Sequence, residues 1–320
     1  MFLSNISTEK GIELVKLSST LSDLAISIAV NIGNTLFSIK KNEKEYLYFP
    51  YLLNEYKNIS QLAGNPFMHP WANRLEGDFI LFNHEKKEFP NAQKKSLYRD
   101  ANNLPLHGLL LKSDKWKTKA IINQSDSISH IAIFEFCEAE ELAIFPFEHT
   151  IEMKTTLTEN SVSIEILFIN NSNQPMPLSS GFHPYFAINP TKKDDLKIEI
   201  PFANVILANE SMIPNGDYLP KEMVFNGFNI HSISLGNNYF DHGFEGIIDF
   251  KKCTVNQLDR KFEVNFGDFP IGQIYAPNKM GKPYICIEPM LAKTNDLNRN
   301  NCEYLNPKSC IKKTFEIIIQ

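Results

Sequence analysis

Apolar and polar residues alternate with a period of two through much of this chain, and this pattern limits the possible folds more than any other feature. In the segment 162–168 every even-numbered residue is apolar, while Ser163 and Glu165 stand between them. Successive side chains of a strand point to opposite faces, so the pattern predicts strands with one buried face. Six more segments rich in β-branched and aromatic residues behave similarly: Leu24–Val30, Ile151–Leu157, Leu196–Ile200, Phe262–Phe266, Tyr284–Glu288 and Phe315–Ile319.

Turn-forming clusters separate these segments, at Asn170–Asn173, Pro214–Asp217 and Pro277–Asn278. Helical patterns are weak and occur only at Ser7–Leu17 and Ser60–Leu62. Because strands and helices do not alternate, a parallel βαβ architecture is disfavoured. No Gly/Ser tract, charge block or repeat divides the 320 residues. The sequence therefore predicts one all-β domain over residues 1–320, a large antiparallel β-sandwich with very little helix, whose concave face is a natural ligand site.

Composition narrows the class of partner. The formal net charge is −5 and the chain has only four arginines, with no basic stripe, so we expect no nucleic-acid partner. The five cysteines show no Cys-x-x-Cys spacing, which argues against a disulfide framework or a zinc knuckle. The N-terminal region does not resemble a signal peptide, and Leu24–Val30 is too short and too interrupted to span a bilayer. We therefore expect a cytoplasmic protein without membrane contact, as a monomer or homodimer.

Two segments bring acid–base groups into apolar surroundings. In Gly181–Phe186, Pro184 biases His183 toward an extended backbone, so that Tyr185 shares its face. A histidine held beside an aromatic ring suits a proton donor to a flat, hydroxyl-rich ligand, and a satisfied core histidine is the alternative. Glu288 ends an apolar strand next to a proline, where a carboxylate is unusual unless it is paired or functional.

Three further segments, Asn73–Phe79, Leu104–Leu109 and Tyr239–Phe244, carry polar groups suited to binding. The Arg74 guanidinium suits bidentate contact with vicinal hydroxyls, and a plain surface charge is the alternative. Asp241 either caps a turn or binds a pair of hydroxyls. His107 lies at a turn or a strand start, where a solvated role is equally open.

Together and in this order, the segments resemble the aldose 1-epimerases, or galactose mutarotases, from about Gly64 to Leu297. The motifs that carry the resemblance are Asn73–Phe79, Leu106–Gly108 with Trp116 downstream, His183–Phe186, Pro214–Gly216, Asp241–Phe244 and Cys286–Pro289. Two places depart from the family pattern. Met290 stands where relatives often carry a larger aromatic residue or a glutamine, and residues 292–296 are less regular than the family's Pro-Asn segment. These departures bear on which sugar is bound more than on the reaction type.

The resemblance implies a galactose mutarotase-like supersandwich. It also implies an enzyme that interconverts the α and β anomers of a free aldohexose, such as galactose or glucose, without a metal or an organic cofactor. Glu288 would be the base for the C1 hydroxyl and His183 the acid for the ring oxygen, with the roles reversed after the C1–C2 bond rotates. The remaining site residues are His107, which assists His183, and the substrate-binding Arg74, Asn73, Asp241 and Gln273.

Ordinary pKa values, about 4.3 for glutamate and about 6.5 for histidine, predict an ionised Glu288 and a His183 whose pKa the carboxylate raises. Three alternatives stay open. A hexose-6-phosphate 1-epimerase would need cations for the phosphate, and Leu111 stands where an arginine of the His-Gly-Phe-Ala-Arg pattern of those enzymes should be. A non-catalytic carbohydrate-binding protein on the same fold would not need both an acid and a base. The third alternative is a metal enzyme whose ligands would be His107, His183, His242 and Glu288. No His-x-His or His-x-x-x-His spacing in the sequence supports it.

Overall fold

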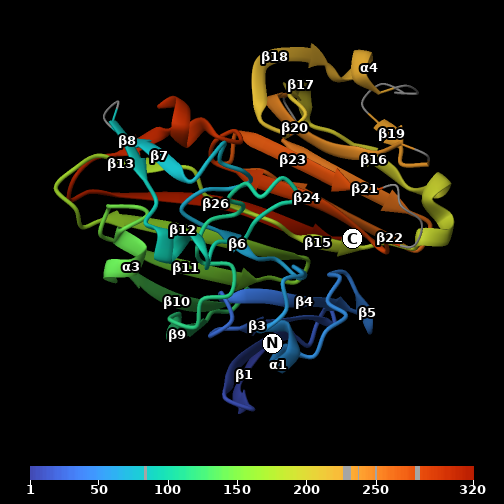
Figure 1. Cartoon of the computed structure of the whole chain (residues 1–320). Helices are drawn as coiled ribbons and strands as arrows, with labels where there is room; N and C mark the ends of the chain where they lie inside the picture. The colour runs from blue at the N-terminus through green and yellow to red at the C-terminus, as the bar shows by residue number, and fades with distance from the viewer. Residues whose placement is uncertain (83–84, 226–231, 237, 249–250, 278–281) are drawn as a thin grey trace.

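The computed structural model describes residues 1–82, 85–225, 232–236, 238–248, 251–277 and 282–320. Strands make up 53% of the chain and helices 8%, so the prediction of an all-β fold with very little helix is confirmed. Two large antiparallel sheets pack face to face, and a third, smaller sheet lies beside them (Figure 1). No helix in the described part of the chain is long and apolar enough to cross a membrane.

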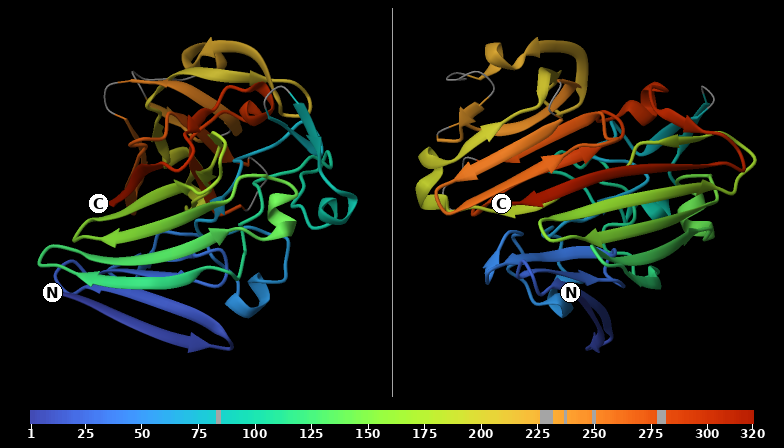
Figure 2. Two further views of the ribbon diagram at one scale, coloured as in Figure 1. Left: turned by 90° about the vertical axis from the view of Figure 1, so that its left-hand side faces the viewer. Right: turned by 180° about the vertical axis from the view of Figure 1, so that it is seen from behind.

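The largest sheet has nine strands. In spatial order they are β19 (Ser232–Ser234), β16 (Lys197–Glu199), β21 (Lys252–Gln257), β22 (Arg260–Asn265), β26 (Cys310–Ile319), β12 (Ser161–Asn170), β11 (His149–Leu157), β10 (Ile128–Phe136) and β9 (Lys117–Asn123). The C-terminal strand β26 lies in the middle, between β22 and β12, as the view from behind shows (Figure 2). The end of the chain thus joins two halves of the sheet that are distant in sequence.

The second large sheet carries the residues singled out for function. In spatial order its strands are β18 (Pro214–Pro220), β17 (Phe202–Ala208), β20 (Phe240–Ile247), β23 (Ile271–Ala276), β24 (Tyr284–Met290), β14 (Gly181–Phe182) and β6 (Phe67–Met68), and β15 (Tyr185–Ala187) also pairs with β24. The β17–β18 hairpin rises at the top of Figure 1. Strand β24 occupies the centre, with β23 on one side and the two short strands β14 and β15 on the other.

The remaining elements are short or peripheral. The N-terminal sheet, at the bottom of Figure 1, consists of β1 (Phe2–Glu9), β2 (Ile12–Ser19), β3 (Leu24–Ala29), β4 (Thr35–Lys41) and β5 (Lys44–Glu45). Two ribbons pair β7 (Phe79–Phe82) with β8 (Glu85–Glu88) and β13 (Met176–Leu178) with β25 (Glu303–Leu305). The helices are α1 (Leu53–Tyr56), α2 (Asn91–Lys94), α3 (Ala139–Leu142), α4 (Lys221–Val224), η1 (Pro190–Asp195) and η2 (Asp296–Arg299).

Aromatic pairs join the two large sheets. Phe186 of β15 stacks on Phe262 of β22 with ring centroids 4.3 Å apart, and Phe182 of β14 lies 4.8 Å from Phe315 of β26. All four rings are almost fully buried. Pairs of this kind add roughly 0.5–1.5 kcal/mol each beyond the burial of their surface. The core therefore anchors one face of β14 and β15 and leaves their other face for the site.

All seven alternating segments form strands, which confirms the main sequence prediction. The helical prediction at Ser7–Leu17 is wrong, because β1 and β2 form a hairpin that turns at Lys10 and Gly11, both with positive φ. Residues 60–62 are not helical either, since the carbonyl groups of Ile59 and Gln61 accept hydrogen bonds from Lys112 Nζ.

The turn expected at Pro214–Asp217 is also wrong. Residues 214–220 form the edge strand β18, and the turn lies earlier, where the Asn209 side chain accepts from the N–H groups of Ser211 and Ile213. Gly216 has a φ of 98° and lies where the register between β17 and β18 shifts. Proline and glycine fit such an irregular edge strand as well as they fit a turn. Of the cluster Pro277–Asn278, Asn278 lies outside the described residues.

Candidate active site

Strand register brings His183 and Glu288 together. Strand β14 pairs Gly181 with Met290, and β15 pairs Tyr185 with Cys286. The same register puts His183, in the break between β14 and β15, opposite Glu288 of β24. Side chains opposite one another in antiparallel strands share a face. The ladder thus positions a histidine and a carboxyl group that are over a hundred residues apart in sequence.

The two side chains form a buried pair. His183 Nε2 lies 3.4 Å from Glu288 Oε1, and the side chains are 7% and 2% exposed. The His183 ring stacks on Tyr185 with centroids 4.5 Å apart and planes 7° apart, which fixes the plane of the imidazole. Nδ1 of His183 and Oε2 of Glu288 have no hydrogen-bond partner among the described residues. Buried polar atoms normally have partners, so these two atoms are suited to a ligand.

Burial governs the protonation of this pair and overturns the charge states expected from the sequence. Burial raises the pKa of Glu288 well above its usual range, and the nearby Asp241 raises it further. Burial lowers the pKa of His183 to about 3. The cost of desolvating either charged form outweighs the attraction between the two groups. At neutral pH the pair therefore carries one proton on Glu288, and the expectation of an ionised Glu288 and a raised His183 pKa is wrong.

A tight turn holds His107 beside this pair. His107 and Gly108 have φ angles of 63° and 72°, and a Cβ atom at Gly108 would lie 2.1 Å from the His69 carbonyl oxygen, so this position requires glycine. The His107 N–H donates to the Asn73 carbonyl at 2.8 Å, and the Asn73 N–H donates to His107 Nδ1 at 3.2 Å. In the neutral ring the hydrogen is therefore on Nε2.

His107 is 6% exposed, and burial lowers its pKa well below the usual value, with smaller contributions from His183 and Arg74. Its ring meets the His183 ring edge-on, with centroids 5.1 Å apart. At neutral pH His107 is thus an uncharged hydrogen-bond donor next to the His183–Glu288 pair.

Arg74 is oriented from two sides. Its Nε donates to Asp100 Oδ2 at 2.7 Å and its Nη1 donates to Asn73 Oδ1 at 2.9 Å. Asp100 is itself held by the backbone N–H groups of Asn102 and Leu104, which donate to its other oxygen. The Arg74 side chain is 15% exposed, so the alternative of a free surface charge is ruled out.

Asp241 and Gln273 enter the same site from β20 and β23. Gln273 Nε2 donates to Asp241 Oδ1 at 2.8 Å, and the Tyr239 hydroxyl lies 3.4 Å from Asp241 Oδ2. Gln273 is paired with Glu288 across the β23–β24 ladder. The amide and the carboxylate thus stand on the face that carries Glu288.

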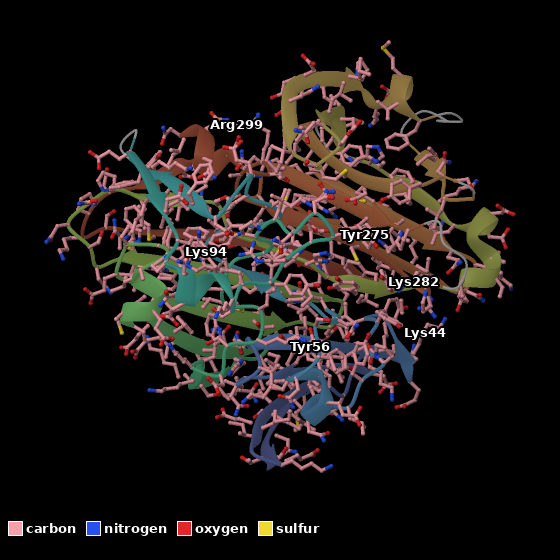
Figure 3. The ribbon with its side chains drawn as sticks, in the orientation of Figure 1. Lys44, Tyr56, Lys94, Tyr275, Lys282 and Arg299 are labelled. Atoms are coloured by element: carbon pink, nitrogen blue, oxygen red, sulfur yellow. The ribbon has the colours of Figure 1, made fainter. Side chains whose placement is uncertain are left out.

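A cavity of about 200 Å³ is bordered by all seven residues selected from the sequence: Asn73, Arg74, His107, His183, Asp241, Gln273 and Glu288. Sequence reasoning missed three residues of this wall, Leu62, Tyr98 and Tyr275, and it also missed Asp100, which binds Arg74 from outside the wall. Tyr275 follows Gln273 by two residues on β23, so period-two reasoning could have found it. It lies toward the middle of the view in Figure 3, below the β17–β18 hairpin and above Tyr56. Leu62 and Tyr98 lie in segments without a recognisable motif.

The metal-binding alternative has no ligand set in the described part of the chain, where no three His, Cys, Asp or Glu side chains are placed to hold an ion. His242 alternates with Asp241 along β20, and its ring meets Phe225 edge-on at 5.0 Å. It therefore points to the other face of the sheet from His107 and His183.

Comparison with known proteins identifies the family of the chain. A family model described as aldose 1-epimerase matches residues 20–310. The chain belongs to the aldose 1-epimerase family. The resemblance seen in the sequence motifs is thereby confirmed. Among curated relatives, the uncharacterized protein YphB of Escherichia coli K12 is 21% identical over 243 residues, which cover 72% of this chain and 73% of YphB.

Solved structures of the family superpose over the whole chain. A galactose mutarotase-like protein from Clostridium acetobutylicum has a TM-score of 0.83 at 18% identity, covering 100% of this chain and 98% of that one. A galactose 1-epimerase from Lactobacillus acidophilus has a TM-score of 0.75 at 13% identity, covering 100% and 98%. A putative aldose 1-epimerase from Escherichia coli K12 has a TM-score of 0.71 at 15% identity, covering 100% and 99%. These similarities establish the galactose mutarotase-like fold.

Proposed function

We propose that this chain is an aldose 1-epimerase, an isomerase that interconverts the α and β anomers of a free aldohexose such as galactose or glucose. The observation that supports this most directly is the buried His183–Glu288 pair, with a 3.4 Å contact and two unpartnered polar atoms at one cavity. Membership in the aldose 1-epimerase family supports the same reaction class.

The reaction needs one proton donor and one proton acceptor. During ring opening, the C1 hydroxyl loses its proton, a carbonyl group forms at C1, the bond from C1 to the ring oxygen breaks, and the ring oxygen gains a proton. A pair that carries a single proton supplies one donor and one acceptor. We assign Glu288 as the group facing the C1 hydroxyl and His183 as the group facing the ring oxygen. Acid–base assistance of this kind contributes about 10²–10⁴-fold.

Each group acts once as acid and once as base. After the C1–C2 bond rotates, the ring hydroxyl attacks the other face of the carbonyl carbon, and both proton transfers run in reverse. For the opening step as assigned, the proton of the pair has to move from Glu288 to His183 when the sugar binds. His107 donates from Nε2 to the ring oxygen or the C1 oxygen, and Arg74, Asn73, Asp241 and Gln273 hold the other hydroxyls. The proposed chemistry requires no metal and no organic cofactor.

A phosphorylated substrate fits this wall poorly. The only guanidinium among the described residues of the cavity wall is that of Arg74, and it already binds Asp100 and Asn73. Asp241 and Glu288 border the same cavity, so a phosphate dianion would lie near carboxyl groups without an unpaired cation. These observations favour a neutral aldose over a hexose 6-phosphate.

We further propose that residues 1–320 form a single domain. The largest hydrophobic cluster runs from Phe2 to Ile319 and includes both large sheets and the N-terminal sheet. Lys41 of β4 also donates to the carbonyl of Ile319 at the end of β26. A cytoplasmic location and a monomeric or homodimeric state remain parts of this proposal.

Polarimetry of freshly dissolved α-D-glucose and α-D-galactose tests the proposed function. The protein is expected to speed relaxation over buffer, and Glu288→Gln and His183→Asn are each expected to slow it by at least about tenfold. Glu245→Gln is a matched control, because Glu245 lies on β20 in the same sheet, binds Lys293 and does not border the cavity. Wild-type relaxation at the buffer rate across a panel of free aldoses would refute the proposal.

Two outcomes of that assay would favour the alternatives. Strong inhibition by glucose 6-phosphate, with faster anomerisation of the phosphate itself than of glucose, would identify a hexose-6-phosphate 1-epimerase. Tight sugar binding with an unchanged anomerisation rate would identify a non-catalytic carbohydrate-binding protein.

A further inference from the structure

A cavity of about 330 Å³, which we call the side cavity, adjoins the cavity that contains the His183–Glu288 pair. Among the described residues, the two cavities share only Leu62 and Tyr98. None of the seven residues assigned to the reaction or to sugar binding borders the side cavity. A molecule bound there is therefore separate from the sugar that reacts.

Two buried oxygen atoms in the wall of the side cavity have no hydrogen-bond partner among the described residues. They are Gln93 Oε1, on α2, and Glu141 Oε2, on α3. The Glu141 side chain is 11% exposed, and its other oxygen accepts from Lys115 Nζ at 2.8 Å. Because buried polar atoms normally have partners, these two oxygens are suited to accept hydrogen bonds from a ligand.

The charged groups of the wall favour a neutral ligand. Lys112 Nζ donates to three backbone carbonyl oxygens, at 2.8, 2.7 and 2.9 Å, which uses all three of its donors. An anion would compete with Glu141 for Lys115 and would lie near two carboxylates, those of Glu140 and Glu141. A cation would lie near two ammonium groups. Two positive and two negative side chains thus leave no net charge to attract an ion of either sign.

The rest of the wall is largely aliphatic. Leu62, Leu111 and Ile144 are almost fully buried there, and Leu109 is partly buried. A sugar presents C–H groups on its faces and hydroxyl donors at its edge, which matches an aliphatic wall that has two unpartnered acceptors. The side cavity is larger than the catalytic cavity of about 200 Å³, so it has room for one hexose.

We propose that the side cavity is a second, non-reacting binding site for a neutral hexose, whose hydroxyl groups donate to Gln93 Oε1 and Glu141 Oε2. The proton donor and acceptor of the proposed reaction both lie in the other cavity, so a hexose bound here is not epimerised. The inference stands apart from the proposed function, because it requires only binding.

Calorimetric titration of the full chain with glucose tests the side cavity. Arg74→Ala weakens the catalytic cavity, so glucose binding that remains in this variant reports the side cavity. Ser60 is exposed and borders the side cavity but not the catalytic cavity. Adding Ser60→Trp to Arg74→Ala is expected to abolish the remaining binding. Asn58→Trp is the matched control, since it adds the same ring at an exposed position that borders neither cavity.

Gln93→Leu is a second variant, which removes one of the unpartnered oxygens and keeps the approximate size of the side chain. In the Arg74→Ala background it is expected to weaken glucose binding about fivefold. In the otherwise wild-type chain, Ser60→Trp and Gln93→Leu are expected to leave the anomerisation rate within about twofold of wild type.

Three results would overturn the side-cavity site. They are no glucose binding to Arg74→Ala, binding that neither Ser60→Trp nor Gln93→Leu changes, and binding of butylammonium or inorganic phosphate that is tighter than that of glucose and is lost in Ser60→Trp. Each of them leaves the proposed function standing if wild type accelerates anomerisation. Glucose binding that Ser60→Trp abolishes, in a chain whose wild type does not accelerate anomerisation, would refute the proposed function and support this inference.

Discussion

Two buried histidines in contact, His69 and His149, allow a quantitative prediction about the stability of the protein in acid. His149 Nδ1 donates to the Phe147 carbonyl at 2.6 Å, and His149 Nε2 lies 2.8 Å from His69 Nε2. Because a carbonyl oxygen can only accept, His149 Nε2 is the acceptor in this pair and His69 Nε2 the donor. His69 Nδ1 then accepts from the Ser180 hydroxyl at 2.8 Å. Every polar atom of the two rings is satisfied only while both are neutral.

Burial lowers the pKa of His149 from 6.5 to about 4. The folded state therefore binds fewer protons than the unfolded chain between these values, and stability is lost as the pH falls from about 6.5 toward 4. A pH of about 5 lies about 1.5 units below the pKa of histidine in the unfolded chain, and each unit corresponds to about 1.36 kcal/mol. His149 alone therefore lowers the free energy of unfolding by about 2 kcal/mol at that pH.

We expect His149→Gln to remove this part of the pH dependence. The variant is expected to be less stable than wild type at about pH 7.5, since its fit to His69 and Phe147 is poorer. It is expected to lose about 2 kcal/mol less than wild type on acidification to about pH 5. Urea unfolding at both pH values measures this difference, and the fluorescence of the buried Trp71 and Trp116 reports the transition.

His242→Gln is the matched control for the acid-stability experiment. The His242 ring is only partly buried, so a smaller change in pH dependence is expected. The argument would be refuted if His149→Gln and wild type lost the same free energy of unfolding on acidification. A loss of stability confined to wild type would support the argument.

Two further predictions concern activity. The rate is expected to stay constant from mildly acidic to mildly alkaline pH. The reason is that His183, with a pKa of about 3, stays able to accept a proton, while Glu288, with a strongly raised pKa, keeps its proton. A kcat/KM profile that falls through about pH 6.5 as the solution becomes more alkaline would instead indicate that a protonated histidine is the acid. Asp100→Asn keeps the shape of the residue that orients Arg74 but removes its charge, so we expect KM for the sugar to rise about tenfold with kcat nearly unchanged. Steady-state polarimetry measures both constants, and Asp114→Asn, which removes a surface partner of Lys57, is the control. An unchanged KM in Asp100→Asn would argue against a positioning role.

The sequence predicted the strands well because most of them bury one face, and a period of two records that burial directly. It failed where local residue types fit two structures. Pro214, Asn215 and Gly216 are turn residues by type, yet they lie in an edge strand with a register shift, and only the pairing with β17 distinguishes the cases. The hairpin at Lys10 was missed because the flanking strand β1 is largely exposed and does not alternate.

The candidate site was predictable to the extent that its residues occur in recognisable motifs. Asp100 and Tyr98 were missed because a loop without a motif brings them to Arg74 and His107. The protonation of the His183–Glu288 pair was predicted in the wrong direction because ordinary pKa values describe groups in water. A single sequence shows that a carboxyl ends an apolar strand, but the size of the desolvation depends on what the other strands and loops place around it.

The corrected protonation makes the proposed chemistry easier to understand. An ion pair in this buried site would have a large desolvation cost, because both charged groups are removed from water. Moving its proton would also create or destroy charge in a medium of low dielectric constant. The resting pair avoids this cost because both groups are neutral, and it becomes a carboxylate and an imidazolium only when the sugar binds and the proton moves from Glu288 to His183. The same face-to-face packing that buries Phe182 and Phe186 on one side of β14 and β15 holds His183 opposite Glu288 on the other. Fold and site thus depend on one strand, β24, and on the break that Pro184 makes beside it.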